Sequence, residues 1–436
     1  MTARVLNPAA GTKNDRVKEG SAAQRHLTGP IMGHALLRIA SGTSGILIGL
    51  YLASLNSHGS HLSVGLVGTL SAVSFAAELL ASIPMGLASD AIEPRWLMTA
   101  GALLGAIAVF LFGISSSPPI FFLSRTLEGV GAAAIVPALL AYITTVTEGR
   151  AALRVRAMSY FELTLLAGLA LGGVVAAQLF RWLHGGAFAA VAVVYLACAA
   201  LLFLSVSGSI SSRVISPIAD LKEVLRLPAI RHLAPVWLCV NSVVGLWLGP
   251  TLPFLLTQHS TNSQYLAGIY ASDPARVGWM LLVYAIVFGI GVTGWSFVLP
   301  YIRLHTAMTI TLTAMLPVCG GLYLLNHSAN QSISTRWIVG VVTALLIMIE
   351  SGFTPAALAW LANTLPADTG RGAAMGIYSV LLSVGAIIGS VLAGVLGERY
   401  LVDGLLYGTV LMAVAGLLFL HWVTDAQSSM NEVTHG

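Results

Sequence analysis

The chain has 436 residues, of which 57% are hydrophobic and only 9% are charged, and its mean hydropathy is +0.86. Soluble globular domains carry about 25% charged residues, so this composition excludes a soluble protein and predicts a polytopic membrane protein. The formal net charge of +4 comes from 21 Lys and Arg residues spread along the chain. They indicate membrane topology and give no reason to expect a nucleic-acid partner.

Residues 1–30 are polar, with seven charged side chains among Gly, Ser and Asn. This stretch is too polar and too long before the first apolar run to be a signal peptide. It predicts a solvated, disordered cytoplasmic tail.

Twelve apolar runs follow, each long enough to cross a bilayer as a helix. They cover roughly residues 31–54, 63–87, 96–114, 119–144, 157–180, 185–206, 233–257, 277–299, 306–325, 337–361, 373–396 and 402–423. The longest internal connection, residues 207–232, contains a short amphipathic pattern and divides the runs six and six. We therefore predict an all-α membrane protein with six-helix bundles at 31–206 and 233–424, a cytoplasmic linker at 207–232 and a C-terminal tail at 425–436.

The basic residues predict the orientation of these spans. Fifteen lie on the side of the two termini, four lie on the opposite side, and Arg38 and Arg125 lie within spans. Because cytoplasmic loops carry the excess of Lys and Arg, both termini are expected in the cytoplasm. The chain itself is expected in the plasma or inner membrane of the cell.

An internal repeat supports the division into halves. Arg154, Met158, Gly168 and Gly172 recur as Arg371, Met375, Gly385 and Gly389, each displaced by 217 residues. Weak internal symmetry of this kind is typical of transporters built from repeats, and the GxxxG spacing predicts close helix packing in both copies. Chance similarity between two Gly- and Ala-rich helices is the alternative.

Charged side chains within the spans are candidates for function, because a charge at membrane depth costs about 2.5–3.5 kcal/mol on insertion scales. Arg125 and Glu128 lie three residues apart in span four and share one helical face. Glu78 and Glu350 lie near the middle of spans two and ten, where an unpaired carboxylate is expected to be either functional or protonated. Arg38 and Glu162 lie nearer to the cytoplasmic ends, where snorkelling or local pairing explains them equally well.

Further polar or aromatic residues could face a central cavity. Candidates for contact with a substrate are Ser74, Glu162, Asn241, Trp247, Tyr284 and Tyr378, although the aromatic residues serve equally as packing or interface anchors. The cysteines, Cys198, Cys239 and Cys319, form no CxxC or His/Cys cluster, so neither a disulfide framework, a metal site nor a cofactor is predicted.

The 6+6 arrangement, with both termini inside, resembles the major facilitator superfamily of secondary transporters over residues 31–424. The loop GLASDAIEPRW resembles the signature loop of that family: Gly86, Asp90 and Arg95 match, whereas Ala91, Glu93 and Pro94 depart from it. In the family this loop latches the cytoplasmic side through charge contacts between the halves. The resemblance implies a gating role for these residues, with Arg154 and Arg371 at the cytoplasmic ends; an ordinary solvated loop is the alternative.

Two more motifs carry the resemblance. The sequence RTLEGVG, from Arg125 to Gly131, is similar to the fourth-span motif Arg-x-x-Gln-Gly-x-Gly, with Glu128 in place of Gln. In proton-coupled exporters of the family this arginine is associated with proton coupling; a structural Arg–Glu pair is the alternative. Gly168, Gly172 and Gly173 resemble the glycine-rich fifth-span motif of antiporters but lack its proline, and helix packing alone could explain them.

The resemblance implies transport by alternating access, in which two halves rock around a central site. We expect proton-coupled efflux of a small amphipathic organic compound or sugar-like metabolite. Glu78, Glu128 or Glu350 would bind the proton, and Arg125 and Arg38 would tune the pKa of that carboxylate. Three acids near one arginine favour a neutral or cationic substrate.

The alternatives are uptake of a nutrient, flipping of a lipid-linked molecule, a non-transporting receptor or assembly protein, or a membrane enzyme. For an enzyme, no metal spacing or nucleophile motif is present. A monomer in the bilayer is expected.

Overall fold

The computed structural model describes residues 13–148, 150–206, 228–258, 264–364 and 371–435. All regular elements in these ranges are helices, as predicted. The N-terminal half contains α1 (Lys13–Ser57), α2 (Val64–Ala91), α3 (Pro94–Gly113), α4 (Pro118–Val146), α5 (Ala151–Leu183), the short 3₁₀ turn η1 (His184–Gly186) and α6 (Ala187–Ser205). The C-terminal half contains α8 (Pro228–Trp247), α9 (Thr251–Thr257), α10 (Ala275–Val298), η2 (Leu299–Tyr301), α11 (Leu304–Asn326), α12 (Ile333–Glu350), α13 (Phe353–Thr364), α14 (Arg371–Tyr400) and α15 (Val402–His435).

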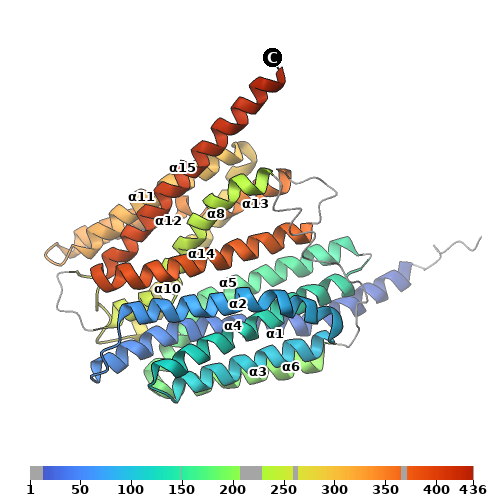
Figure 1. The fold of residues 1–436 in the computed structure, drawn as a ribbon, viewed down its shortest axis with the longest axis horizontal. Coiled ribbons are helices and arrows are strands. Elements are labelled where there is room, and N and C mark those ends of the chain that lie inside the picture. The colour runs from blue at the N-terminus through green and yellow to red at the C-terminus, as the bar shows by residue number, and fades with distance from the viewer. Residues whose placement is uncertain (1–12, 149, 207–227, 259–263, 365–370, 436) are drawn as a thin grey trace, which may run out of the picture.

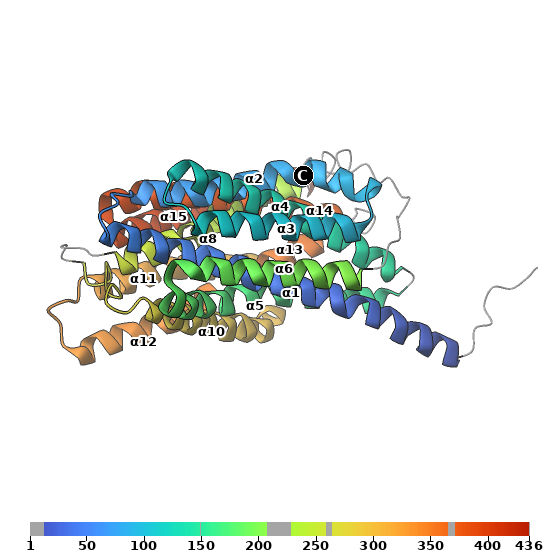
Figure 2. The ribbon, with the colours of Figure 1, turned by 90° about the horizontal axis from the view of Figure 1, so that it is seen from below.

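In Figure 1, α1 begins at the right and α15 ends at the top, so both ends of the described chain lie on the side of the molecule away from the loops drawn at the left. We call this the proximal end. The opposite, distal end carries the loops at residues 58–63, 184–186, 264–274 and 327–332. Figure 2 shows the long helices of the N-terminal half packed side by side. In Figure 1 the C-terminal half lies above the N-terminal half.

Eleven stretches of the described chain are long and apolar enough to span a membrane. One of them, Ala170–Ser205, contains both the end of α5 and all of α6. The chain reverses direction between these two helices, at η1. Counting these two helices separately gives the twelve predicted spans. Helix α1, however, begins at Lys13, so the expected disordered tail is already helical there; its Lys, Arg, Glu and Ala residues are good helix formers.

Two spans predicted as continuous helices are broken. Span seven stops at Trp247 and resumes as α9 at Thr251, and Pro250, which has no backbone N–H, lies in the break. Span ten stops at Glu350 and resumes as α13 at Phe353. At this second break the indole ring of Trp295 occupies the space that a Cβ on Gly352 would need. Sequence periodicity gave no signal for either break, because both flanking segments are apolar.

The predicted repeat reappears in the packing of the two halves. Gly168 and Gly172 of α5 lie against the backbone of α1 at Arg38 and Gly42. Gly385 and Gly389 of α14 lie against α8 at Asn241 and Ser242 in the same way. Span five therefore packs on span one as span eleven packs on span seven, which explains why both copies keep glycine at this spacing.

We expect Gly42→Ala to destabilise the protein by about 1–3 kcal/mol, because overpacking a tight helix contact forces the backbones apart. A methyl group at position 42 would lie 2.5 Å from the Gly168 carbonyl oxygen. Gly45→Ala is the matched control on the same helix, since no atom lies within 4 Å of its added Cβ. Thermal unfolding in detergent should separate the two variants; equal melting temperatures would contradict the packing described here.

The two halves pack tightly against each other at the distal side. Gly68 of α2 lies against Ser390 and Gly394 of α14, and the Ser390 hydroxyl donates to Ser71 Oγ at 3.1 Å. Gly49 of α1 lies against α9, and Gly278 of α10 lies against α5. The buried apolar residues of the described chain form two clusters.

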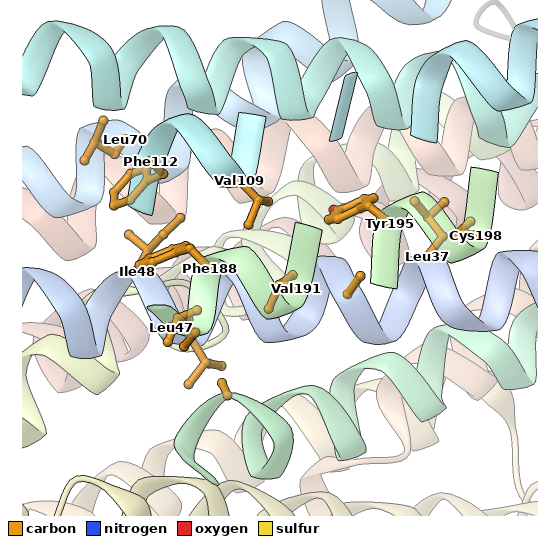
Figure 3. Packing of buried hydrophobic residues seen from close by; sticks show 14 of the residues in the cluster. Leu37, Leu47, Ile48, Leu70, Val109, Phe112, Phe188, Val191, Tyr195 and Cys198 are labelled. Atoms are coloured by element: carbon orange, nitrogen blue, oxygen red, sulfur yellow. The ribbon is translucent and has the colours of Figure 1, made fainter. Parts of the chain in front are cut away.

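One buried cluster runs through the N-terminal half and continues into the distal ends of the C-terminal helices, where it includes Leu252, Phe254, Ala393 and Leu405. Figure 3 shows part of this cluster, with Phe112 beside Phe188. The rest of the C-terminal half has a separate core, which includes Trp237, Leu312 and Ala357. Among the residues whose burial is described, the halves thus share a core only towards the distal end.

Candidate functional site

An ion pair is buried within the N-terminal half, on α4. The Arg125 guanidinium forms a salt bridge with the Glu128 carboxylate one helical turn away. Only 7% of Arg125 and 6% of Glu128 is exposed. Arg125 Nε also donates to the Leu70 carbonyl oxygen of α2 at 3.5 Å. The predicted meeting of the two charges is therefore present in the structure, and neither charge is left without a partner.

Two further helices reach the Glu128 carboxylate. The Tyr195 hydroxyl of α6 donates to Oε1 at 3.3 Å, and the Ser44 hydroxyl of α1 donates to Oε2 at 3.3 Å. Tyr195 and Ser44 were not among the predicted residues, because nothing in an apolar segment such as span six marks one tyrosine as a partner of span four. Burying a charge requires both a counter-charge and hydrogen bonds, and this carboxylate has both.

Glu78 lies within electrostatic range of Arg38 and of both members of this pair. The approach of Glu78 depends on Gly129, next to Glu128, because a Cβ there would collide with the Ser74 carbonyl oxygen and lie 3.0 Å from the Glu78 nitrogen. The first glycine of the fourth-span motif thus lets α2 bring its carboxylate towards the charges of α4. Ser74 is itself buried. We call Arg38, Glu78, Arg125 and Glu128 the charge cluster.

A buried histidine adjoins the charge cluster and was missed by sequence reasoning. Arg38 Nε donates to His34 Nε2 at 3.2 Å, and His34 Nδ1 lies 2.6 Å from Thr164 Oγ1 of α5. The imidazole also stacks on Phe161 with ring centroids 4.4 Å apart. Because Nε2 accepts from the guanidinium, the imidazole is neutral in this arrangement and carries its proton on Nδ1. The spacing of His34 and Arg38, four residues apart in one span, could have indicated this contact.

Glu350 belongs to a different site, in the C-terminal half. It is the last residue of α12, at the break in span ten. Trp295 Nε1 of α10 donates to the Ile349 carbonyl oxygen at 2.9 Å and so fixes this end of the helix. Tyr284 and Cys319 lie within electrostatic range of the Glu350 carboxylate, but no hydrogen bond or salt bridge to it is found in the described part of the chain. The structure therefore joins Glu78 and Glu128 in one cluster and places Glu350 apart from it.

The remaining cavity candidates have mixed surroundings. Trp247 Nε1 donates to Thr409 Oγ1 at 2.7 Å, a contact between α8 and α15 that favours a packing role. Asn241 is buried against Gly385, and its Nδ2 has no hydrogen-bond partner among the described residues. The ring of Tyr284 lies 5.8 Å from that of Phe288. The side chains of Glu162 and Tyr378 lie outside the described part of the structure.

The candidate gating loop lies at the proximal end, between α2 and α3. Arg95 pairs with Glu93 at 3.4 Å and lies over the rings of Trp96 and Phe203, at 5.3 Å and 5.1 Å from their centroids. All three partners belong to the N-terminal half. The side chains of Asp90, Arg154 and Arg371 lie outside the described part of the structure, as does the linker at 207–227, so a latch between the halves remains a prediction.

Neither the charge cluster nor the rest of the described chain gathers three His, Cys, Asp or Glu side chains that could hold a metal ion. What the charge cluster offers is a set of titratable groups on α1, α2 and α4, held inside the membrane-spanning region. Such groups suit the binding and release of a proton, because each carboxylate can change charge without a change in fold.

Comparison with known proteins agrees with this arrangement. The profile of the Major Facilitator Superfamily matches residues 32–333 and again residues 247–435. Multidrug resistance protein 2 of Bacillus subtilis (strain 168) is 31% identical over 112 residues, which are 26% of this chain and 28% of that protein. Multidrug resistance protein 1 of the same organism is 30% identical over an equally long stretch. The alignment thus spans little more than a quarter of these relatives.

Solved transporter structures share the fold at low sequence identity. The peptide transporter POT in complex with alafosfalin superimposes with a TM-score of 0.70 at 14% identity, covering 92% of this chain and 94% of that one. The nucleoside transporter NupG gives 0.67 at 13% identity, with 92% and 98% covered. A bacterial homologue of the human lysosomal transporter Spinster, in an inward-facing and occupied conformation, gives 0.66 at 15%, with 95% and 98% covered.

Proposed function

Since the chain belongs to the Major Facilitator Superfamily of membrane transporters, we propose that it is a proton-coupled exporter of a small amphipathic organic compound. The charge cluster carries this proposal. Its four charged side chains come from three helices, and Arg125 and Glu128 are buried. Charges at this depth mark substrate or ion pathways more often than they stabilise a fold.

The guanidinium groups of the charge cluster suit a role in proton coupling. An arginine stays charged throughout a transport cycle, whereas a carboxylate beside it can gain or lose a proton. Glu128 is already held by Arg125, Tyr195 and Ser44. Glu78 and Glu350 have neither salt bridge nor hydrogen bond in the described chain, so we assign the transported proton to one of these two. Moving one charge across 100 mV supplies about 2.3 kcal/mol, enough for roughly fifty-fold accumulation.

Two observations favour export of an amphipathic compound. The partial sequence match is to multidrug resistance proteins, and the fourth-span motif resembles that of exporters. The nucleoside and peptide transporters share only the fold, and fold alone does not assign a substrate. The acids Glu78, Glu128 and Glu350 favour a neutral or cationic molecule over an anionic one.

We take the proximal end as cytoplasmic, because the basic residues gather there. The distal contacts between α2 and α14, α1 and α9, and α5 and α10 would then close the outer side of the membrane. In this state a substrate reaches the centre from the cytoplasm, as an exporter requires before it turns outward.

The proposal is tested with the purified protein in proteoliposomes whose lumen is more acidic than the bath. We expect fluorescent cationic amphipathic dyes to accumulate inside by exchange for protons, and a protonophore should abolish this accumulation. Empty liposomes under the same pH gradient give the passive background. Accumulation that is unchanged by the protonophore, or that requires the opposite gradient, would overturn proton-coupled export.

A further inference from the structure

A carboxylate at the distal end links the two halves of the molecule. Glu398 lies in the last turn of α14, in the C-terminal half, and its Oε2 accepts a hydrogen bond from the backbone N–H of Gly65 at 3.0 Å. Gly65 is the second residue of α2, in the N-terminal half. The bond therefore runs from the end of one helix to the beginning of another, 333 residues away in the chain.

The electrostatics of both helix ends favour this contact. The first backbone N–H groups of a helix have no partner within the helix, and this end carries a partial positive charge. The last turn carries a partial negative charge, so Glu398 is unfavourably placed with respect to its own helix. On the other side of the contact between the two halves, the Glu398 carboxylate lies instead at the positive end of α2. Ser63 Oγ caps the same end by accepting from Leu66 N at 3.1 Å, so α2 has one cap from each half.

The contact borders a close packing of α2 on α14, which we call the seam between the halves. One turn further along α2, Gly68 lies so close to α14 that a Cβ would be 2.5 Å from the Ser390 carbonyl oxygen and 2.6 Å from Gly394. Ser71 and Ser390 follow, with their hydroxyl groups 3.1 Å apart. Ser390 is only 1% exposed. The distal end cannot open unless this whole seam separates, and separation removes the cap that Glu398 gives to α2.

We propose that Glu398 is a positioning residue that stabilises the closed state of the distal end by capping α2 from the opposite half. The inference rests on the alternating-access part of the proposed function and not on the proton, the direction of transport or the substrate.

The test measures how often the seam opens. In a protein whose native cysteines are replaced by alanine, Ser390→Cys gives a reporter that reacts with a bulky hydrophilic maleimide only when α2 and α14 separate. We expect Glu398→Gln to raise the modification rate about two- to fivefold, the effect of removing one exposed charge from a helix end. Molar salt should reduce the difference, because the interaction is screened.

Asp273→Asn is the matched control, since Asp273 pairs at the distal end with Arg276 of the same half, and its loss should leave the rate unchanged. Glu398→Asp gives a second test, because the shorter carboxylate keeps the charge and should lie between parent and Gln variant. An unchanged rate in Glu398→Gln would overturn the proposal, and so would an equal rise in the Asp273→Asn control. No gradient or substrate is involved, so failure here is distinguishable from failure of proton-coupled export.

Discussion

Replacing Arg125 with glutamine is expected to destabilise the protein by about 3–5 kcal/mol, the effect of leaving a buried charge without its partner. Arg125 supplies the salt bridge to Glu128 and a hydrogen bond to the Leu70 carbonyl oxygen. Without it, the Glu128 carboxylate keeps only the hydroxyl groups of Tyr195 and Ser44. Hydrogen bonds of this kind do not replace a full counter-charge inside a membrane protein.

Glu128→Gln also removes one member of the pair. Its effect should be smaller, because Arg125 keeps its hydrogen bond to the Leu70 carbonyl oxygen and has the Glu78 carboxylate within electrostatic range. The double variant, with glutamine at both positions, should recover much of the stability lost in Arg125→Gln, because it buries no unpaired charge. Denaturant unfolding in lipid–detergent micelles gives the free energy of unfolding of the parent, the two single variants and the double variant. The coupling energy is the part of the double variant's effect that the two single effects do not account for. A coupling near zero would show that the pair contributes nothing to the fold.

The charge cluster shows how far sequence reasoning reaches. The meeting of Arg125 and Glu128 could be predicted, since residues three apart in a helix share a face whatever the tertiary structure. The contacts of Glu128 with Tyr195 and Ser44 could not, because they depend on how α4, α6 and α1 are arranged around one another. Glu350 illustrates the opposite error. Hydropathy placed it with the other acids at mid-membrane, but equal depth in the bilayer does not say whether residues of the two halves lie close together.

The fold shows the same limit. Twelve spans, two halves and the glycine contacts of α5 and α14 follow from local composition and from a repeat within the chain. The distal network does not: Gln264, Asn326 and Asp403 are 62 to 139 residues apart, yet Asn326 Nδ2 donates to Gln264 Oε1 at 3.0 Å and to Asp403 Oδ1 at 2.8 Å. His327 Nε2 completes it at 2.9 Å from Asp403 Oδ2. One polar residue at the end of each apolar run carries no pairing signal.

The break in span ten gives Glu350 a place in the transport cycle. Glu350 ends α12, where the last carbonyl groups of a helix point into the break with a partial negative charge. A carboxylate in this place has no counter-charge among the described residues, so during the cycle it requires neutralisation by a proton or by a cationic substrate. Discontinuous helices in transporters form ion and substrate sites for this reason.

We therefore expect Glu350→Gln to reduce gradient-driven dye accumulation at least tenfold while the protein folds normally, because glutamine resembles a carboxyl group that never releases its proton. Exchange of dye across the membrane without a pH gradient should persist, since alternating access itself needs no titration. Asp273→Asn is the matched control: Asp273 pairs with Arg276 at 3.2 Å on the exposed distal side, and its loss should leave accumulation intact. If Glu350→Gln accumulates dye normally and Glu78→Gln does not, the proton belongs to the charge cluster of the N-terminal half.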